Sequence, residues 1–286
     1  MLNISGSKIF VSSNFGYYLM LLPAVVMLLG FFAAPLAGVV IISLTEPRVG
    51  LDNYALLFTS SSVQRALVTT LRISAITVSI TLVLGFVIAY AMRTAGSRQA
   101  RWMLFCVLFP FWISVLVRSF AWITLLRPNG VINTALIGAG IIDTPLALVR
   151  NEVGVVIGMV HVMLPYAVLT LYASMRGISA ALPNAARGLG ASPFQAFIRV
   201  FLPLTRPGIY AATVLVFVLS LGFYITPAIL GGGRTLMIAE YVAVQINETV
   251  RWGLGTMLAT TLTAAVLGAM WTLSRIVDVR GVLGPR

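Results

Sequence analysis

The sequence contains few charged residues and very few acids. Only 9% of its 286 residues are charged, and 7 acids stand against 19 lysines and arginines. A soluble domain of this length needs far more charge to cover its surface, so a soluble globular fold is excluded. With 59% of residues hydrophobic and a mean hydropathy of +1.01, the chain is predicted to lie mainly in hydrocarbon.

Cysteine and histidine are nearly absent, with one copy of each. The single cysteine, Cys106, excludes a disulfide framework within the chain. The single histidine, His161, provides too few ligands for a metal site, so we expect no metal and interpret His161 as a helix-packing residue. The phosphate-binding pattern G-x-x-x-x-G-K-[ST] is also missing, so we expect this chain to bind no cofactor and to hydrolyse no ATP.

Long apolar runs take the place of charge. Alternating strands typical of membrane barrels are not found, whereas several apolar runs reach the ~20 residues that a helix needs to cross a bilayer. Because backbone groups in lipid must be satisfied internally, we predict an all-α fold: a single polytopic membrane domain, residues 1–286, with six transmembrane helices. The predicted spans lie near 17–44, 67–92, 102–126, 153–175, 207–230 and 254–277.

Charge divides the loops between these spans into two kinds. Loops 93–101 and 176–206 contain arginines and no acid, whereas loops 45–66, 127–152 and 231–253 each balance two acids against two arginines. Since cytoplasmic loops carry an excess of Lys and Arg, the first two are predicted to be cytoplasmic. The chain is therefore expected in a bacterial inner membrane as a multi-pass protein with both termini in the cytoplasm.

Loop 176–206 is predicted to form a helix–turn–helix, which we call the elbow. Pro183 stands in a first helical turn, and Ser192 is a good N-cap for a second helix that starts at Pro193. That helix is predicted to end at Leu202-Pro203 and to carry an apolar face. The residues of this face are Phe194, Phe197, Ile198 and Phe201. The elbow is interpreted either as an interfacial anchor or as a docking surface for a cytoplasmic protein.

The spacing within the elbow resembles a known signature. Asn184-Ala185-Ala186, three residues, Gly190, nine residues and 200–203 resemble the EAA motif of binding-protein-dependent ABC importer permeases: Glu-Ala-Ala, three residues, Gly, nine residues, Ile-x-Leu-Pro. The resemblance implies that this loop is a coupling helix that docks on an ATPase subunit. The implied coupling residues are Asn184, Ala185, Ala186, Arg187, Gly190, Leu202 and Pro203. Asn184 replaces the usual acid, so a hydrogen bond is expected there instead of a salt bridge.

Further motifs are similar to the PotB/PotH-type spermidine/putrescine permeases of this family. They are LFPFW at 108–112, LVRSFAW at 116–122, RPNGVIN at 127–133 and ITPAILGG at 225–232. The resemblance implies alternating-access import of a polyamine or a related amine or amino compound from periplasm to cytoplasm. It also implies three partners: an ABC ATPase dimer that uses ATP and Mg²⁺, a second permease subunit that is a different chain, and a periplasmic solute-binding protein. Membrane lipid surrounds the chain, and no nucleic acid is expected.

Candidate residues for the solute pathway are aromatic or charged. They are Phe111, Trp112, Arg118, Tyr166, Phe223, Tyr224 and Glu240. A charge inside a span is a functional candidate, but we favour a structural role for Arg118, bonded to backbone carbonyls or to an acid on a neighbouring helix. Aromatic rings can guide a cation by cation–π contact, and Glu240 is the nearest acid that could face the outer mouth.

Two other classes of function remain as alternatives. A secondary transporter of small polar solutes would be expected to carry acids within its spans for ion coupling, and none lies in the middle of a span. A membrane-embedded enzyme would need a nucleophile with a base, or a metal cluster, at membrane depth. An importer of the same type for a non-polyamine solute also remains open.

Overall fold

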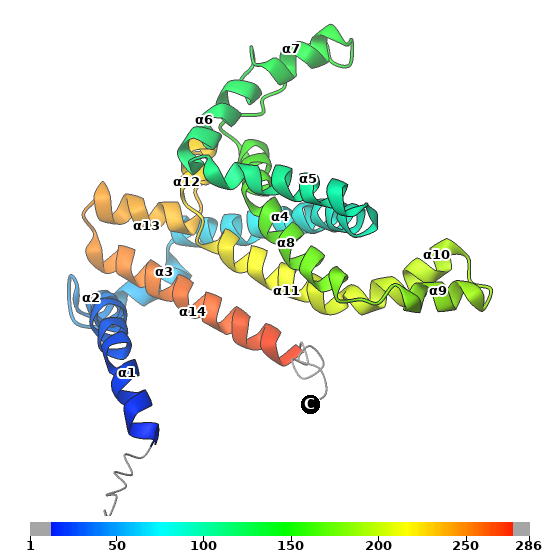
Figure 1. The fold of residues 1–286 in the computed structure, drawn as a ribbon. Helices are drawn as coiled ribbons and strands as arrows, with labels where there is room; N and C mark the ends of the chain where they lie inside the picture. Colours follow the sequence, from blue (N-terminus) through cyan, green and yellow to red (C-terminus); the bar gives the residue numbers. More distant parts are fainter. Residues whose placement is uncertain (1–12, 277–286) are drawn as a thin grey trace, which may run out of the picture.

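The computed structural model describes residues 13–276, which form helices and connecting segments without a strand. Figure 1 shows a bundle from which the elbow and the α6–α7 segment project. The helices are α1 Ser13–Leu28, α2 Ala34–Thr45, α3 Asp52–Thr59, α4 Ser61–Thr94, α5 Ser97–Leu108, α6 Val115–Leu126, α7 Val131–Gly138, α8 Glu152–Arg176, α9 Ala181–Gly188, α10 Pro193–Ala196, α11 Leu202–Leu221, α12 Ile225–Gly231, α13 Ile238–Asn247 and α14 Trp252–Ile276. Two π-helical turns, Leu29–Ala33 and Phe197–Phe201, and a 3-10 turn, Phe109–Trp112, join some of them.

Five helices among the described residues are long and apolar enough to cross a membrane. They are Tyr18–Thr45, Ser61–Thr94, Glu152–Arg176, Pro193–Leu221 and Trp252–Thr272. A sixth crossing results if the bent pair Ser97–Trp112 and Val115–Gly138 counts as one span. The all-α polytopic fold is therefore confirmed, whereas residue 277 of the last predicted span lies outside the described residues.

The third predicted span, 102–126, is not one continuous helix. The helices on either side of its break meet at 99°. Pro110 lies in the 3-10 turn just before the break, where the amide of Ile113 donates to the Pro110 carbonyl at 3.2 Å. Ser114 is then in a non-helical conformation with ψ 139°, and α6 restarts at Val115. A proline that removes one helical hydrogen bond, followed by this extended residue, accounts for the break.

The predicted helix end at Leu202-Pro203 is wrong. The helix that begins at Pro193 continues through Phe197–Phe201 into α11 and ends at Leu221, before the predicted limit of 230. The amide of Leu202 bonds to the carbonyl of Phe197, five residues back, so the turn before Pro203 is widened. This π-helical geometry accommodates a proline ring that would otherwise clash with the preceding turn.

The core of the bundle is the packing of α4 on α8, with α11 against both. Gly85 of α4 lies so close to α8 that an added Cβ would stand 3.0 Å from the Cβ of Ala167. Small residues of this kind let transmembrane backbones approach each other. At the far end of the pair, Arg72 of α4 forms an ion pair with Glu152 of α8. The two helices are thus packed along their length and joined by charge at one end.

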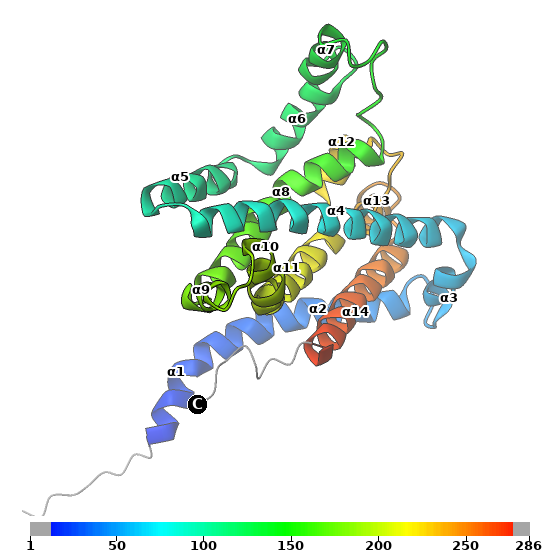
Figure 2. The ribbon, with the colours of Figure 1, turned by 90° about the vertical axis from the view of Figure 1, so that its right-hand side faces the viewer.

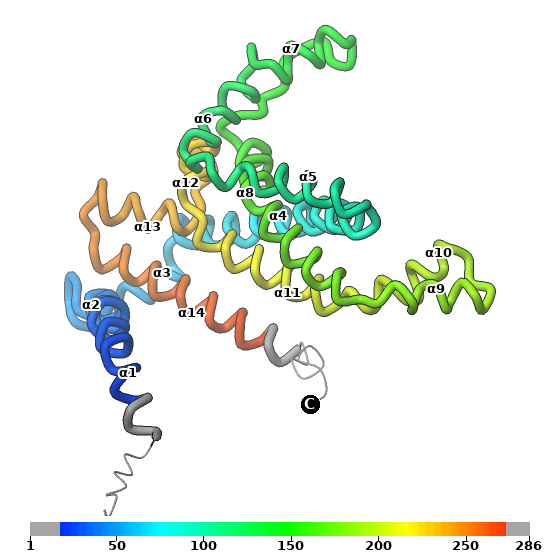
Figure 3. Tube along the Cα trace, in the orientation of Figure 1, coloured from blue at the N-terminus to red at the C-terminus, as the bar shows by residue number. Residues whose placement is uncertain are grey.

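The two basic loops lie at the same end of the bundle. Figures 1 and 2 place the α4–α5 connection and the elbow together, with α3 and α13 at the opposite end. The trace in Figure 3 shows that α4 runs between these two ends. This arrangement is the one that the charge pattern of loops 93–101 and 176–206 requires.

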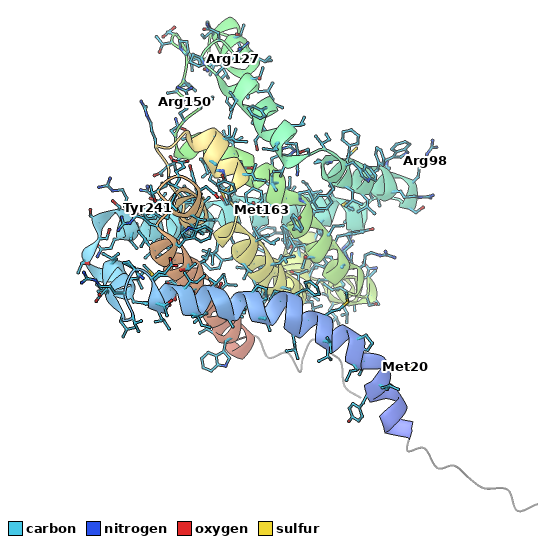
Figure 4. All side chains as sticks on the ribbon, turned by 90° about the vertical axis from the view of Figure 1, so that its left-hand side faces the viewer. Met20, Arg98, Arg127, Arg150, Met163 and Tyr241 are labelled. Atoms are coloured by element: carbon cyan, nitrogen blue, oxygen red, sulfur yellow. The ribbon has the colours of Figure 1, made fainter. Side chains whose placement is uncertain are left out.

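The first helical segment, α1–α2, contacts the rest of the chain mainly through α14. Figure 4 shows Met20 on the part of this segment that leaves the bundle. Met20 is 81% exposed and Phe31 82% exposed. Side chains this apolar require a lipid or protein environment.

Candidate functional site

The elbow, residues 176–206, contains α9, a tight turn and α10, which continues through Phe197–Phe201 into α11. Gly190 in the turn has φ +94°, a conformation that L side chains rarely adopt, so glycine is required there by the backbone. Ser192 caps α10: its Oγ accepts from the amide of Gln195 at 3.2 Å, and Gln195 Oε1 accepts from the amide of Ser192 at 3.0 Å. The predicted N-cap at Ser192 is confirmed as part of a reciprocal capping box.

The outward surface of the elbow combines small and apolar residues with Asn184 and Arg187. Asn184 and Ala185 are exposed and Ala186 is half-buried. Leu189 at the turn is 91% exposed, and Phe194 at the start of α10 is 70% exposed. Of the other coupling residues, Arg187 and Gly190 are exposed, whereas Leu202 and Pro203 are half-buried at the start of α11. The elbow thus presents apolar side chains beyond the end of the bundle.

The apolar face of the second elbow helix divides into two rows. Phe197 is half-buried and Phe201 is buried, whereas Phe194 and Ile198 are exposed. The buried row packs on the end of α4, where the ring of Tyr90 meets Phe197 at 5.2 Å and Phe201 at 5.3 Å between centroids. One row therefore fastens the elbow, and the other remains open.

Arg93, in the last turn of α4, is a contact of the elbow that sequence reasoning missed. Its Nε donates to the carbonyl of Met175 at 2.9 Å, and its Nη2 donates to the carbonyl of Ile178 at 2.7 Å. Its guanidinium also lies 4.9 Å from the ring centroid of Phe201. The sequence shows only a cation at the end of a span, whereas its acceptors lie more than 80 residues away. Beside these contacts is a cavity of about 160 Å³ whose lining includes Asn184 and Arg187.

A second cluster lies within the spans. The rings of Phe111 and Tyr166 stand 5.1 Å apart, and Phe223 packs in the same hydrophobic cluster as Tyr166. His161 accepts from Trp122 Nε1 through Nδ1 at 2.8 Å, which agrees with a packing role for this histidine. The structure therefore brings together Phe111 of the 3-10 turn, Tyr166 of α8 and Phe223 of the segment between α11 and α12.

Arg118 is buried on α6, only 9% exposed. Its Nε and Nη1 find no hydrogen-bond partner among residues 13–276. The expected bonds from these two atoms to carbonyls or to a neighbouring acid are therefore not found. A break in the helix just before α6, not a continuous span, sets the position of this side chain.

The remaining pathway candidates lie apart from this cluster. Trp112 is 72% exposed and contacts Phe105 and Phe109, and Tyr224 is 44% exposed. Glu240 on α13 is only 6% exposed, and its Oε2 has no hydrogen-bond partner in the described part of the chain. Burial raises the pKa of the Glu240 carboxyl to about 7, against a lowering by the Met237 backbone.

Buried hydroxyl groups on α4 are a feature that was not predicted from the sequence. Ser74, Thr77 and Thr81 are fully buried, and no hydrogen-bond partner of their oxygens is present within residues 13–276. Ser220 of α11 shares this property. The helical spacing of the three residues in the second span places them on one face, and this pattern could have identified them. As for metals, no group of three or more His, Cys, Asp or Glu side chains gathers in the described residues.

A membrane-spanning helical bundle with a basic elbow at one end defines a polytopic membrane protein. Residues 81–278 match the family of the binding-protein-dependent transport system inner membrane component. The chain belongs to this family. The secondary transporter and the membrane-embedded enzyme are thereby set aside.

Relatives agree with this membership, and a solved structure shares the fold. The chain is 34% identical over 232 residues to the spermidine/putrescine transport system permease protein PotB of Escherichia coli, covering 80% of this chain and 84% of that protein. It is 33% identical over 215 residues to PotB of Haemophilus influenzae, covering 75% of each. The fold is similar to a bacterial alginate ABC transporter in complex with alginate pentasaccharide-bound periplasmic protein. That comparison has a TM-score of 0.79 and 20% identity, and covers 92% of this chain and 94% of the other.

Proposed function

We propose that this chain is the permease subunit of an ATP-driven importer and that the elbow couples it to the ATPase. The observation that carries the proposal is the elbow, a capped helix–turn–helix beyond the end of the bundle with Leu189 and Phe194 exposed. Exposed apolar side chains among arginines fit a protein surface better than water. Asn184, Ala185, Ala186, Arg187 and Gly190 form the central part of the contact.

The partners follow from what the chain lacks. ATP and Mg²⁺ are used by a separate ABC ATPase dimer, because the sequence has no phosphate-binding loop. This subunit is non-catalytic and binds no cofactor. A second permease, a different chain, shares the membrane with it, and a periplasmic solute-binding protein delivers solute to the outer loops. The solute crosses from periplasm to cytoplasm by alternating access.

The elbow and the α4–α5 connection face the cytoplasm, and so do both termini. The arginines of the two basic loops support this orientation. The termini themselves, residues 1–12 and 277–286, lie outside the described residues. Their orientation rests on Lys8 and on the basic residues at the end of the sequence.

The solute is a polyamine or a related amine. The two PotB relatives support this class, and the adjacent rings of Phe111 and Tyr166 offer aromatic surface that can attract a passing cation. Glu240 offers a buried carboxyl with an oxygen that no described residue engages. A specific observation favours a second candidate, an importer of the same type for a non-polyamine solute: the buried guanidinium of Arg118 would repel a cation.

The docking role is tested best at Ala185. A side chain at Gly190 would strain the backbone whether or not an ATPase binds there, whereas Ala185 is exposed on a helix. Ala185→Trp is expected to abolish ATPase co-purification in mild detergent, since a bulky ring prevents close seating. Ala211→Trp, at an exposed position of α11, is the control and should bind ATPase normally. Normal association of the Ala185 variant would reject the docking surface.

The solute is tested in liposomes that contain the permease pair and the ATPase. With the cognate binding protein present, putrescine or spermidine is expected to stimulate ATP hydrolysis. Absence of any response to amines, with a response to another solute, would reject the amine and leave the importer in place.

A further inference from the structure

We propose that Arg93 is a positioning residue that ties both ends of the elbow to α4, so that the α4–α8 pair carries elbow motion across the membrane. The proposal rests on the docking function proposed above. It differs from a connection through the flanking helices α8 and α11 alone, because α4 is not adjacent to the elbow in sequence.

The first end of the elbow is held by hydrogen bonds. Arg93 reaches from α4 to the carbonyl of Met175 in the last turn of α8 and to that of Ile178 just beyond it. Helix-end carbonyls lack intrahelical donors, and a cation there is favourable. A guanidinium is planar and holds its N–H donors in a rigid arrangement. Because Arg93 bonds two carbonyls three residues apart, it fixes the direction in which the chain leaves α8.

The second end is held by the same side chain and its neighbours. The Arg93 guanidinium lies over the ring of Phe201, which is buried where the elbow enters α11. Tyr90, one helical turn earlier, contacts both Phe197 and Phe201 edge-on, and Phe86 contacts Phe197 at 6.2 Å. The end of α4 therefore fastens the elbow both where it begins and where it ends.

α4 makes a second contact with α8, well before its last turn. Arg72 and Glu152 pair α4 with α8, and Gly85 brings the two backbones close between Arg72 and Arg93. Arg72 and Arg93 are 21 residues apart on one continuous helix (93 − 72 = 21), or ~32 Å at 1.5 Å per residue. That length matches the hydrocarbon thickness of a bilayer, ~30 Å. Because α4 and α8 are closely packed along this length, the pair moves as one body, so displacement of the elbow reaches the opposite end of the bundle.

The neighbouring cations provide a contrast. Arg98 and Arg101 on α5 are exposed, and neither side chain forms an ion pair or hydrogen bond within residues 13–276. Figure 4 shows Arg98 at the outer edge of the molecule. Arg98 is therefore a matched control, because it has the same charge as Arg93 but makes none of the contacts that Arg93 makes.

The first test measures coupling in the assembled complex with the ATPase, the second permease and the binding protein. Arg93→Gln is expected to keep ATPase association and basal hydrolysis while transport per ATP hydrolysed falls roughly tenfold, a drop equivalent to the net loss of about one hydrogen bond to a charged group. Arg93→Lys keeps the charge but not the planar guanidinium, so its transport per ATP hydrolysed should lie between those of the wild type and Arg93→Gln. Arg98→Gln should match the wild type. Wild-type coupling in the Arg93→Gln complex would overturn the proposal.

The second test measures rigidity by pulsed electron spin resonance. In a Cys106→Ser background, spin labels at Ala181→Cys on α9 and Val68→Cys on α4 occupy exposed positions at the two ends. The distance distribution is expected to stay narrow and unchanged between nucleotide-free and ATP-bound complexes, and to broaden with Arg93→Gln. A nucleotide-dependent change in the wild-type distance, or no broadening in the variant, would contradict the rigid connection.

If the Arg93→Gln complex fails to assemble, a second variant, Tyr90→Ala, still tests the proposal. Tyr90→Ala loses the ring contacts with Phe197 and Phe201 while Arg93 remains, and it is expected to broaden the same distribution. If neither variant changes coupling or distance, Arg93 is only a helix cap. Failure of the docking function is a separate result, since it shows as normal ATPase binding by Ala185→Trp.

Discussion

Two buried ionisable side chains, Arg118 and Glu240, distinguish this permease at the scale of single residues. Each has at least one side-chain atom without a protein partner among residues 13–276, and each lies in a different part of the fold. Buried polar groups without partners reduce the free energy of unfolding unless water or a ligand engages them. Their retention at that cost is typical of positions that serve function.

Removing the Arg118 guanidinium should therefore stabilise the fold and impair transport. Arg118→Met is expected to raise the free energy of unfolding by ~1–3 kcal/mol, because buried N–H groups without acceptors are eliminated. Thermal unfolding of the purified complex and solute uptake measure the two effects. Arg98→Met, at an exposed position, should change neither, and a lower melting temperature for Arg118→Met would show that Arg118 is bonded after all.

The Glu240 carboxyl predicts a pH dependence of stability. Its pKa in the fold is about 7, above the ordinary 4.5, so between these values the folded state holds a proton that the unfolded state has lost. Stability should therefore fall as pH rises through that window and level off above it. Glu240→Gln should flatten the melting temperature measured from pH ~5 to ~8, whereas Asp143→Asn, at an exposed position, should not. If Glu240→Gln shows the same dependence of melting temperature on pH as the wild type, another group is responsible for the titration.

At the scale of elements, the second elbow helix depends on its cap. Ser192→Ala removes the acceptor of the Gln195 amide and is expected to cost ~1 kcal/mol of local stability. Amide exchange over residues 194–196 should then accelerate about fivefold, measured by mass spectrometry. Ser179→Ala, before α9, is the control and should leave exchange in α10 unchanged. Equal rates in both variants would mean that packing on α4, not the cap, holds this helix.

Local chemistry in the sequence predicted the elements it controls directly. The Ser192 cap, the elbow and most spans follow from residues within one or two turns, so these were predictable. The break after Pro110 was not, because prolines such as Pro165 lie within an unbroken helix, α8. The course of the helix through Pro203 was not predictable either, because a π-helical turn depends on how the neighbouring helices hold that segment.

At the scale of the whole molecule, the orientation can be tested with a membrane-impermeant thiol reagent. In a Cys106→Ser background, Leu189→Cys on the elbow should react only when the reagent has access to the cytoplasmic side of the membrane. Its loop is basic, and basic loops lie on that side. Ile141→Cys, 68% exposed in the loop after α7, should react from the periplasm. Labelling of both cysteines from one side would contradict the proposed topology.

The contacts that unite the elbow with the bundle could not be read from the sequence. Arg93 and its acceptors are more than 80 residues apart, and a single sequence gives no sign of their proximity. The ring contact between Phe111 and Tyr166 depends likewise on the broken third span. Long-range pairs of this kind follow from the packing of α4 on α8.

The two π-helical turns have one further consequence, an angular one. Leu29–Ala33 precedes Pro35, and Phe197–Phe201 precedes Pro203, each with one residue between turn and proline. A π turn holds one residue more than the α turn it replaces, and one residue corresponds to ~100° of rotation about the helix axis. Phe201 points at α4 only with that extra residue in place. A single deletion within Phe197–Phe201 would turn the elbow by about a quarter of a circle relative to α11, so length in this segment must be as constrained as composition.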